Sequence, residues 1–232
     1  DADFVMMCVG NDDDLREVAM GAQGAIQHMR SGALLIDHTT SSAGVARELA
    51  EEAEEWGVGF MDAPVSGGQL GAQKGELTIM CGANEADFVN AEKILACYSI
   101  RLRRMGDVGA GQLAKMVNQI CVAGLLQGLA EGMHFAERNG LDVAAVMEVI
   151  SQGAAASWQM QNRYKTMIER EFDFGFAVKW MRKDLGYVLA EARRSGASLP
   201  VTALIDQFYA DVESMGGAGW DTSSLIQRLR AQ

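Results

Sequence analysis

The sequence predicts an α/β domain followed by an all-α domain. Within residues 1–105, short apolar runs alternate with amphipathic helical stretches, which is typical of βα units on a mostly parallel sheet. From Ala110 to about Arg138 the chain is apolar nearly all round, which predicts one long buried helix. Strand-like alternation does not return after that helix. We therefore divide the chain into residues 1–107 and residues 108–232.

The first domain is predicted to consist of four strands and three helices. The expected strands cover residues 4–9, 33–40, 58–65 and 76–82, and the expected helices cover Asp12–Met29, Ser42–Trp56 and Glu85–Ala96. Ligands of such sheets bind beyond the carboxyl ends of the strands. Three of these ends carry the sequences CVGN (8–11), HTTS (38–41) and PVSGG (64–68).

The second domain is predicted to be helical throughout. After the long helix, the expected helices cover residues 143–152, 156–168, 177–195, 201–215 and 223–230. Gly124, Gly128 and Gly132 are spaced four apart on the long helix and would let another helix approach closely. Gly140 marks the expected end of the long helix.

The composition excludes several classes of partner. The formal net charge is −11 and there is no basic tract, which argues against nucleic acid or an anionic membrane surface. We find no apolar run of membrane-spanning length and no signal peptide. The chain opens DADFVMMCVGN, without Met and already inside a predicted strand, so we expect further residues upstream.

The cysteines and histidines show no metal-ligand spacing. Cys8, Cys81, Cys97 and Cys121 are scattered through apolar stretches, and we expect buried free thiols in a reducing, cytoplasmic compartment. His28, His38 and His134 are equally dispersed, so no metal is expected.

Lys115 is a cation near the start of the apolar helix, in GAGQLAKMVNQ. Asn118 lies three residues further on, so both side chains share one helix face. The helix dipole disfavours a lysine there, and a snorkelling surface lysine and a functional lysine are equally compatible with the spacing. If Lys115 is buried, desolvation lowers its pKa, which suits a proton donor.

Ser66-Gly67-Gly68 combines a hydroxyl with backbone N–H groups in a turn able to take positive φ. Such a nest binds anions such as a carboxylate, although an ordinary turn is the simpler interpretation of these residues alone. Asp62 is expected to be a structural partner of backbone N–H groups. Lys183 and Asp184 are expected to form a surface pair, and Trp158 and Trp180 to pack at a helix or domain contact.

Three separated motifs together resemble the β-hydroxyacid dehydrogenase family, including 3-hydroxyisobutyrate dehydrogenase and tartronate semialdehyde reductase. They are DAPVSGGQLGAQKGELTIMCGA (62–83), GAGQLAKMVNQ (109–119) and MRKDLGYVLAEA (181–192), in that order and spacing. The resemblance implies a Rossmann-type domain that binds NAD or NADP. It also implies an all-α domain, built around the long helix, that completes the active site.

The resemblance also implies roles for individual residues. Ser66, Gly67 and Gly68 would hold the substrate carboxylate, Lys115 would be the catalytic proton donor and acceptor, and Asn118 would help to hold the substrate. Lys183 would reach cofactor and substrate. Cys8, Val9 and Thr39 would touch the dinucleotide; here the match is looser, because CVGN stands where many relatives carry Leu-Pro.

The family's glycine-rich phosphate loop, G-x-G-x-x-G, does not occur in this sequence. The residue that selects NAD or NADP is missing with it. We therefore expect the first two βα units to be missing, and the cofactor type stays undetermined.

The implied activity interconverts a small 3-hydroxy or 2-hydroxy carboxylic acid and its semialdehyde or keto acid, in a homodimer or homotetramer. A glyoxylate or succinic semialdehyde reductase of the same superfamily and a non-catalytic interaction module are the alternatives. Lys115 argues against the module and against imine reductases, whose members usually lack that lysine. Asn118-Gln119, in place of a His-Asn pair, argues against a phosphorylated sugar acid. Trp158, Phe176 and Trp180 are the positions expected to select among substrates.

Overall fold

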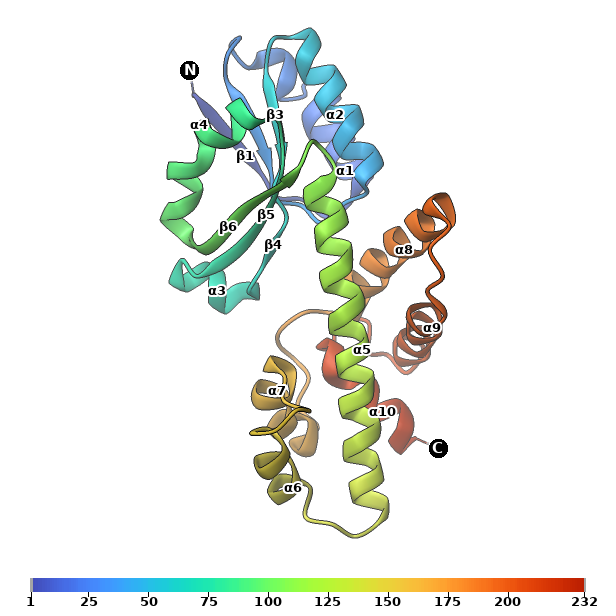
Figure 1. Cartoon of the computed structure of the whole chain (residues 1–232). Coiled ribbons are helices and arrows are strands. Elements are labelled where there is room, and N and C mark those ends of the chain that lie inside the picture. The colour runs from blue at the N-terminus through green and yellow to red at the C-terminus, as the bar shows by residue number, and fades with distance from the viewer. Residues whose placement is uncertain (1, 232) are drawn as a thin grey trace. The chain divides into compact units, whose positions relative to one another are not determined.

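The computed structural model describes residues 2–231 and contains two compact units, Asp1–Val117 and Asn118–Gln232 (Figure 1). The first is an α/β unit and the second is helical, which confirms the predicted fold class.

The α/β unit is built on a six-stranded mixed sheet. Strands β1, β2 and β3 are parallel neighbours, β5 runs antiparallel to β3 and β4, and β6 pairs in parallel with β5. In this register Asp37 and Asp62, the last residues of β2 and β3, lie side by side. The strands are β1 (Phe4–Met7), β2 (Leu34–Asp37), β3 (Gly59–Asp62), β4 (Val65–Ser66), β5 (Leu77–Gly82) and β6 (Ser99–Gly106).

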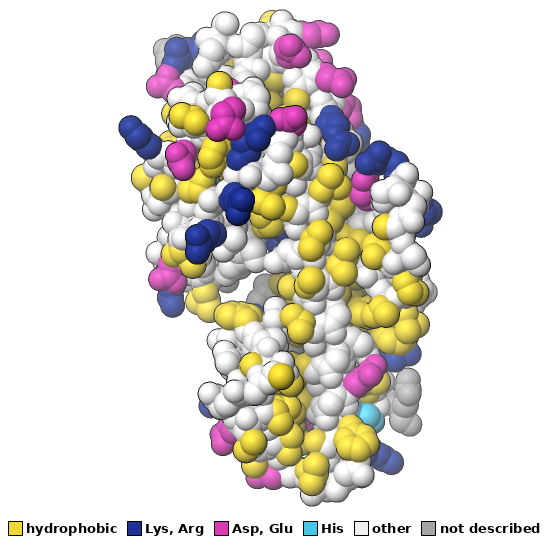
Figure 2. All heavy atoms as spheres, in the orientation of Figure 1, with side chains coloured by type: hydrophobic (Ala, Val, Ile, Leu, Met, Phe, Trp, Pro, Cys, Tyr) yellow, Lys and Arg dark blue, Asp and Glu magenta, His cyan; other side chains and the backbone are white. Residues whose placement is uncertain are grey.

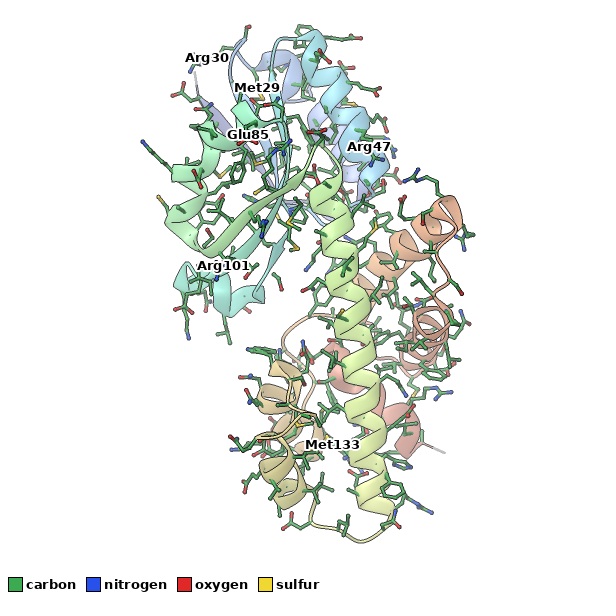
Figure 3. The ribbon with its side chains drawn as sticks, in the orientation of Figure 1. Met29, Arg30, Arg47, Glu85, Arg101 and Met133 are labelled. Carbon is green, nitrogen blue, oxygen red and sulfur yellow. The ribbon has the colours of Figure 1, made fainter. Side chains whose placement is uncertain are left out.

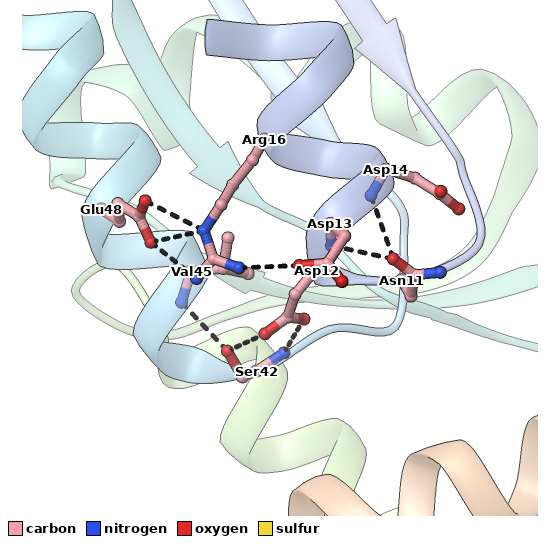
Figure 4. A network of polar contacts seen from close by, with 8 residues as sticks. All are labelled: Asn11, Asp12, Asp13, Asp14, Arg16, Ser42, Val45 and Glu48. Atoms are coloured by element: carbon pink, nitrogen blue, oxygen red, sulfur yellow. Dashed lines mark hydrogen bonds and ion pairs between the residues drawn. The ribbon is translucent and has the colours of Figure 1, made fainter. Parts of the chain in front are cut away.

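Polar side chains fix the starts of the helices that follow β1 and β2. Asn11 caps α1, and Ser42 caps α2 by accepting the N–H of Val45. The Asp12 carboxylate accepts both the N–H and the hydroxyl of Ser42, so the two helix starts are tied together (Figure 4). The helices of this unit are α1 (Asp12–Met20), α2 (Ala43–Glu55), α3 (Gly68–Lys74) and α4 (Glu85–Leu95), with short 3-10 turns at Ile26–His28 and Ala96–Tyr98.

The sequence prediction was wrong in three places in this unit. The helix expected over Asp12–Met29 ends at Met20, because Gly21 has ψ 172° and leaves the helical conformation; a Cβ on Gly21 would overlap the Glu17 carbonyl oxygen. Strand β6 and helix α3 were not predicted. Strand β6 pairs only with β5 among the described strands, and it carries three arginines, as exposed edge strands often do.

The helical unit packs around α5 (Ala110–Arg138), whose bounds match the predicted long helix. Helix α5 begins in the α/β unit and continues through the division at Val117 and Asn118. Met133, labelled in Figure 3, is a fully buried residue of the helical core. The other helices are α6 (Val143–Ile150), α7 (Trp158–Glu169), α8 (Val178–Ser195), α9 (Pro200–Ser214) and α10 (Leu225–Arg230).

Helix α5 is long and apolar enough to cross a membrane, judged by length and composition only. The expectation that no run reaches this length was therefore wrong. The central helix of a water-soluble domain passes the same test, and the α5 residues Ala123, Leu126, Ala130 and Met133 belong to the buried core of the helical unit.

Candidate active site

The Ser66–Gly68 turn has the positive φ angles that the sequence predicted. Gly67 has φ +129° and Gly68 has φ +60°, a conformation that side chains with a Cβ rarely adopt. Ser66 is half-buried, whereas both glycines are exposed. A Cβ on Gly67 would come within 3.2 Å of Leu77, but a Cβ on Gly68 would meet no described atom within 4 Å. Solvent therefore reaches the backbone of this turn.

Asp62, four residues before Ser66, holds the start of α5. Its Oδ1 accepts the N–H of Gly109 at 2.7 Å and its Oδ2 accepts the N–H of Gln112 at 2.8 Å. Burial raises the pKa of this carboxyl to about 6, and the two N–H groups oppose that rise by favouring the charged form. The predicted role of Asp62 as a partner of backbone N–H groups is confirmed.

Gln112, which the sequence analysis did not single out, ties the first turn of α5 to the loop after β2. Its side chain is fully buried. Its Oε1 accepts the N–H of Ser41 at 3.0 Å, and its Nε2 donates to the carbonyl oxygen of Thr39 at 2.7 Å. The one sequence feature that could have identified Gln112 is its polar side chain within an apolar helix.

Thr39 joins three elements at the carboxyl edge of the sheet. Its Oγ1 accepts the N–H of Val9 at 2.9 Å, and its N–H donates to Asp37 Oδ1 at 2.9 Å. Burial raises the pKa of Asp37 to about 7, the hydrogen bonds from Thr39 oppose the rise, and the charge of nearby Asp62 adds to it. Thr39 is 1% exposed, and its hydrogen bonds hold the ends of β1 and β2 together. The next residue, Thr40, is half-buried.

The edge formed by β1 and β2 carries neutral groups that a dinucleotide could contact. Cys8 is exposed, Val9 and Thr40 are half-buried, and the Ser41 hydroxyl is buried without a hydrogen-bond partner among the described residues. The start of α1 carries Asp12, Asp13 and Asp14, which disfavour the pyrophosphate there.

Lys115 is buried in α5, one helical turn beyond Gln112, with 8% of its surface exposed. This burial argues against a surface lysine that extends into solvent and meets the condition set for a functional lysine. Lys115 and the Ser66–Gly68 turn belong to the same compact unit.

In the helical unit, Gln119 and Asp184 link the predicted site residues Asn118 and Lys183 through two hydrogen bonds and an ion pair. Asn118 Nδ2 donates to Gln119 Oε1 at 2.8 Å, and Gln119 Nε2 donates to Asp184 Oδ2 at 2.6 Å. Lys183 Nζ lies 3.3 Å from the other Asp184 oxygen. Asp184 is 2% exposed, so the expectation of a surface Lys-Asp pair was wrong.

Aromatic side chains lie close to Lys183. Its Nζ is 5.5 Å from the ring centre of Trp180 and 5.6 Å from that of Tyr187, within range of cation–π attraction. Trp158, Phe176 and Trp180 are all exposed in this chain. The expected packing of the two tryptophans at a helix or domain contact stays a prediction.

The cysteines differ from the expectation in their exposure. All four are free, but only Cys81 is buried, and Cys8, Cys97 and Cys121 are exposed. The expectation of buried thiols was therefore wrong for three of them.

Comparisons with known proteins cover nearly the whole chain. A protein-family model described as the NAD binding domain of 6-phosphogluconate dehydrogenase matches residues 1–106. A second family model, described as NAD-binding of NADP-dependent 3-hydroxyisobutyrate dehydrogenase, matches residues 109–229.

Individual relatives agree with these matches. An uncharacterized oxidoreductase of Shewanella frigidimarina is 59% identical over 98% of this chain and 78% of its own length. The 2-hydroxy-3-oxopropionate reductase of Escherichia coli is 31% identical over 98% of this chain and 78% of its own length. The structure of Mycobacterium tuberculosis 3-hydroxyisobutyrate dehydrogenase with L-serine has a TM-score of 0.87 and 28% identity, covering 99% of this chain and 80% of the other.

The chain therefore belongs to the β-hydroxyacid dehydrogenase family, the family of 3-hydroxyisobutyrate dehydrogenase. It is an oxidoreductase, and its cofactor is NAD or NADP. The non-catalytic interaction module considered from the sequence is thereby set aside.

Proposed function

We propose that this protein interconverts a small 3-hydroxy or 2-hydroxy carboxylic acid and the corresponding semialdehyde or keto acid. One observation carries the proposal: a solvent-reached Ser-Gly-Gly turn and a buried lysine occur in one compact unit, on elements that Asp62 joins. An anion nest and a proton donor are the two protein groups that this reaction needs.

Two relatives support the substrate class. One is named for 2-hydroxy-3-oxopropionate, and the other was solved with L-serine. Both molecules are three-carbon acids that carry a carboxylate close to an oxygenated carbon. That is the chemistry that a carboxylate-binding turn and a proton-donating lysine would recognise together.

Each site residue has a proposed role in the reaction. The N–H groups of Gly67 and Gly68 and the hydroxyl of Ser66 hold the substrate carboxylate. In reduction, the Lys115 ammonium gives a proton to the substrate oxygen as the carbonyl becomes an alcohol; in oxidation, neutral Lys115 removes the hydroxyl proton. Asn118 orients the same oxygen. The hydride would come from, or go to, NAD or NADP when the cofactor is bound.

Cofactor contacts are proposed for Cys8, Val9, Thr39 and Lys183. The exposure of Cys8 and the partial exposure of Val9 support the first two. Thr39 acts mainly by holding Val9, because its hydroxyl accepts the Val9 N–H. Lys183 is oriented by Asp184, which suits a cation that reaches a bound group.

Residues outside the carboxylate-binding turn are proposed to select the substrate by its length. The exposed aromatics Trp158, Phe176 and Trp180 are the positions proposed to separate hydroxyisobutyrate and tartronate semialdehyde from glyoxylate or succinic semialdehyde.

Ser66→Ala tests the carboxylate grip in the protein expressed from its complete gene. We expect KM for a 3-hydroxy acid to rise roughly 10-fold, because one hydrogen bond to a charged group is lost. The dissociation constant of the dinucleotide should not change. The matched control is the methyl ester of the same acid, for which wild type and variant should differ little. Equal losses on acid and ester would contradict the grip, and an absence of turnover on every hydroxy acid and semialdehyde acid would contradict the proposed function.

We also propose that the protein is a homodimer or homotetramer. A groove of about 330 Å³ in the helical unit supports this, because it is lined by Gly124, Gly128 and Gly132 together with apolar side chains from α5, α6 and α7. A Cβ on any of these glycines would meet no described atom within 4 Å. Figure 2 shows apolar side chains gathered on this face of the helical unit.

Gly128→Leu is expected to lower the molecular mass of the assembly measured by light scattering, because the new side chain fills the groove. Gly44→Leu, at an exposed position on α2, is the control and should leave the mass unchanged. An unchanged assembly in Gly128→Leu would contradict the groove as the contact.

A cytoplasmic location is proposed as well. It is supported by four cysteines without a disulfide, since free thiols persist in reducing compartments.

A further inference from the structure

Asp62 and Gln112 form a buried connection between the turn proposed to bind the substrate and the helix that carries Lys115. We infer that both are positioning residues, which set where the Lys115 ammonium lies relative to Ser66–Gly68. The inference rests on the proposed function, because it gives Lys115 the role of proton donor.

Asp62 restrains the first turn of α5 at two points. Its two carboxylate oxygens are used separately, one by the N–H of Gly109 and one by the N–H of Gln112. Two bonds to different residues of one helical turn restrain rotation of the helix as well as its distance from β3. One bond would restrain only the distance.

The start of α5 packs closely against the sheet. A Cβ on Gly111 would overlap the carbonyl oxygen of Met80, and it would come 2.8 Å from the Asp62 backbone oxygen. A Cβ on Gly109 would come 3.0 Å from the guanidinium of Arg47, which is labelled in Figure 3. The backbone of α5 therefore lies directly on the ends of β3 and β5.

Gln112 adds a third and fourth bond on another side of the same turn. Its amide accepts from Ser41 and donates to Thr39, and both of these residues follow β2. The first turn of α5 is thus held by two neighbouring strand ends. One of them continues through Ala63 and Pro64 into the Ser66–Gly68 turn.

A small rotation of the first turn of α5 displaces the Lys115 ammonium by a larger distance. Lys115 lies three residues beyond Gln112, about 4.5 Å along the axis and on nearly the same face. Its side chain extends to roughly 6 Å from the axis, so a rotation of about 10° moves the nitrogen by about 1 Å. A displacement of that size costs on the order of 100-fold in rate when a reacting group must be aligned.

The test is a double-mutant cycle in the protein expressed from its complete gene, with single-turnover rates measured at saturating dinucleotide. Asp62→Asn keeps the size and one acceptor, but it places an amide NH2 against one of the two N–H groups. We expect the rate on a hydroxy acid to fall roughly 10- to 100-fold with an unchanged dissociation constant for the dinucleotide. In a Lys115→Ala background the same change should cost less than about twofold, because there is no ammonium left to position.

Asp37→Asn is the matched control. Asp37 is as buried as Asp62 and lies beside it in the register, yet its hydrogen bonds go to Thr39 and not to α5. Any loss in this variant should be the same factor in the Lys115 and Lys115→Ala backgrounds. A purely structural role of Asp62 would give that same behaviour.

Gln112→Leu provides a second variant if Asp62→Asn does not fold, with circular dichroism as the check on folding. It should show the same dependence on Lys115. Equal losses in both backgrounds, for whichever of the two variants folds, would overturn the inference and leave the proposed function intact. If Lys115→Ala alone keeps full turnover, the role of Lys115 fails, and this inference fails with it.

Discussion

Lys115→Ala is expected to lower turnover on hydroxy acids by on the order of 10²- to 10⁴-fold, the usual contribution of a positioned proton donor. The cause is the loss of the group that gives or takes the substrate proton. Dinucleotide binding should persist, since the contacts proposed for the dinucleotide come from Cys8, Val9, Thr39 and Lys183. Steady-state kinetics and dinucleotide titration measure the two effects separately.

Two further variants separate the ways in which Lys115 could act. Lys115→Arg keeps the positive charge but cannot serve as a base near neutral pH. Its oxidation rate should therefore stay low even if substrate binding recovers. Lys165→Ala, at an exposed position on α7, is the control and should behave as wild type. Turnover that survives Lys115→Ala would refute the assignment.

Gly111→Val is expected to destabilise the α/β unit by roughly 3 kcal/mol, near the upper end for overpacked sites. The new side chain would overlap the Met80 carbonyl oxygen, and the backbone there cannot yield without breaking the β5 ladder. The first turn of α5 would be forced off the sheet, and activity would fall with stability. Urea denaturation followed by circular dichroism measures the loss.

Gly44→Ala serves as the control for helix propensity. This exposed glycine of α2 has room for a Cβ, and alanine should stabilise the protein by about 0.5–1 kcal/mol. If Gly111→Val unfolds at the same urea concentration as wild type, the close approach of α5 to β3 and β5 is not present in solution.

The parts of the fold that the sequence predicted best are those with long, uniform patterns. Helix α5 is apolar over 29 residues, so its period and both ends were clear. Helix α3 was missed because QLGAQKG follows two glycines and looks like a loop. Strand β6 was missed because its arginines hide the alternation that marks a strand with one buried face.

The candidate site divides in the same way. Residues within continuous motifs, such as Ser66–Gly68 and Lys115, could be named from their order along the chain. Gln112, Gln119 and Asp37 could not, because their importance comes from partners 65 to 73 residues away for the two glutamines, and from burial for Asp37. Spacing along one chain does not show which polar side chains face inward.

The hydrogen-bonded row Asn118, Gln119, Asp184 and Lys183 limits how the sequence can change over evolutionary time. Loss of Gln119 alone removes the N–H that donates to buried Asp184 Oδ2. Loss of Asp184 alone removes an acceptor of the Gln119 amide and the carboxylate beside the Lys183 ammonium. Either single change is expected to cost stability, because a buried polar group loses a bond. Positions 119 and 184 are therefore expected to vary together among descendants of a common ancestor, as an inherited pair.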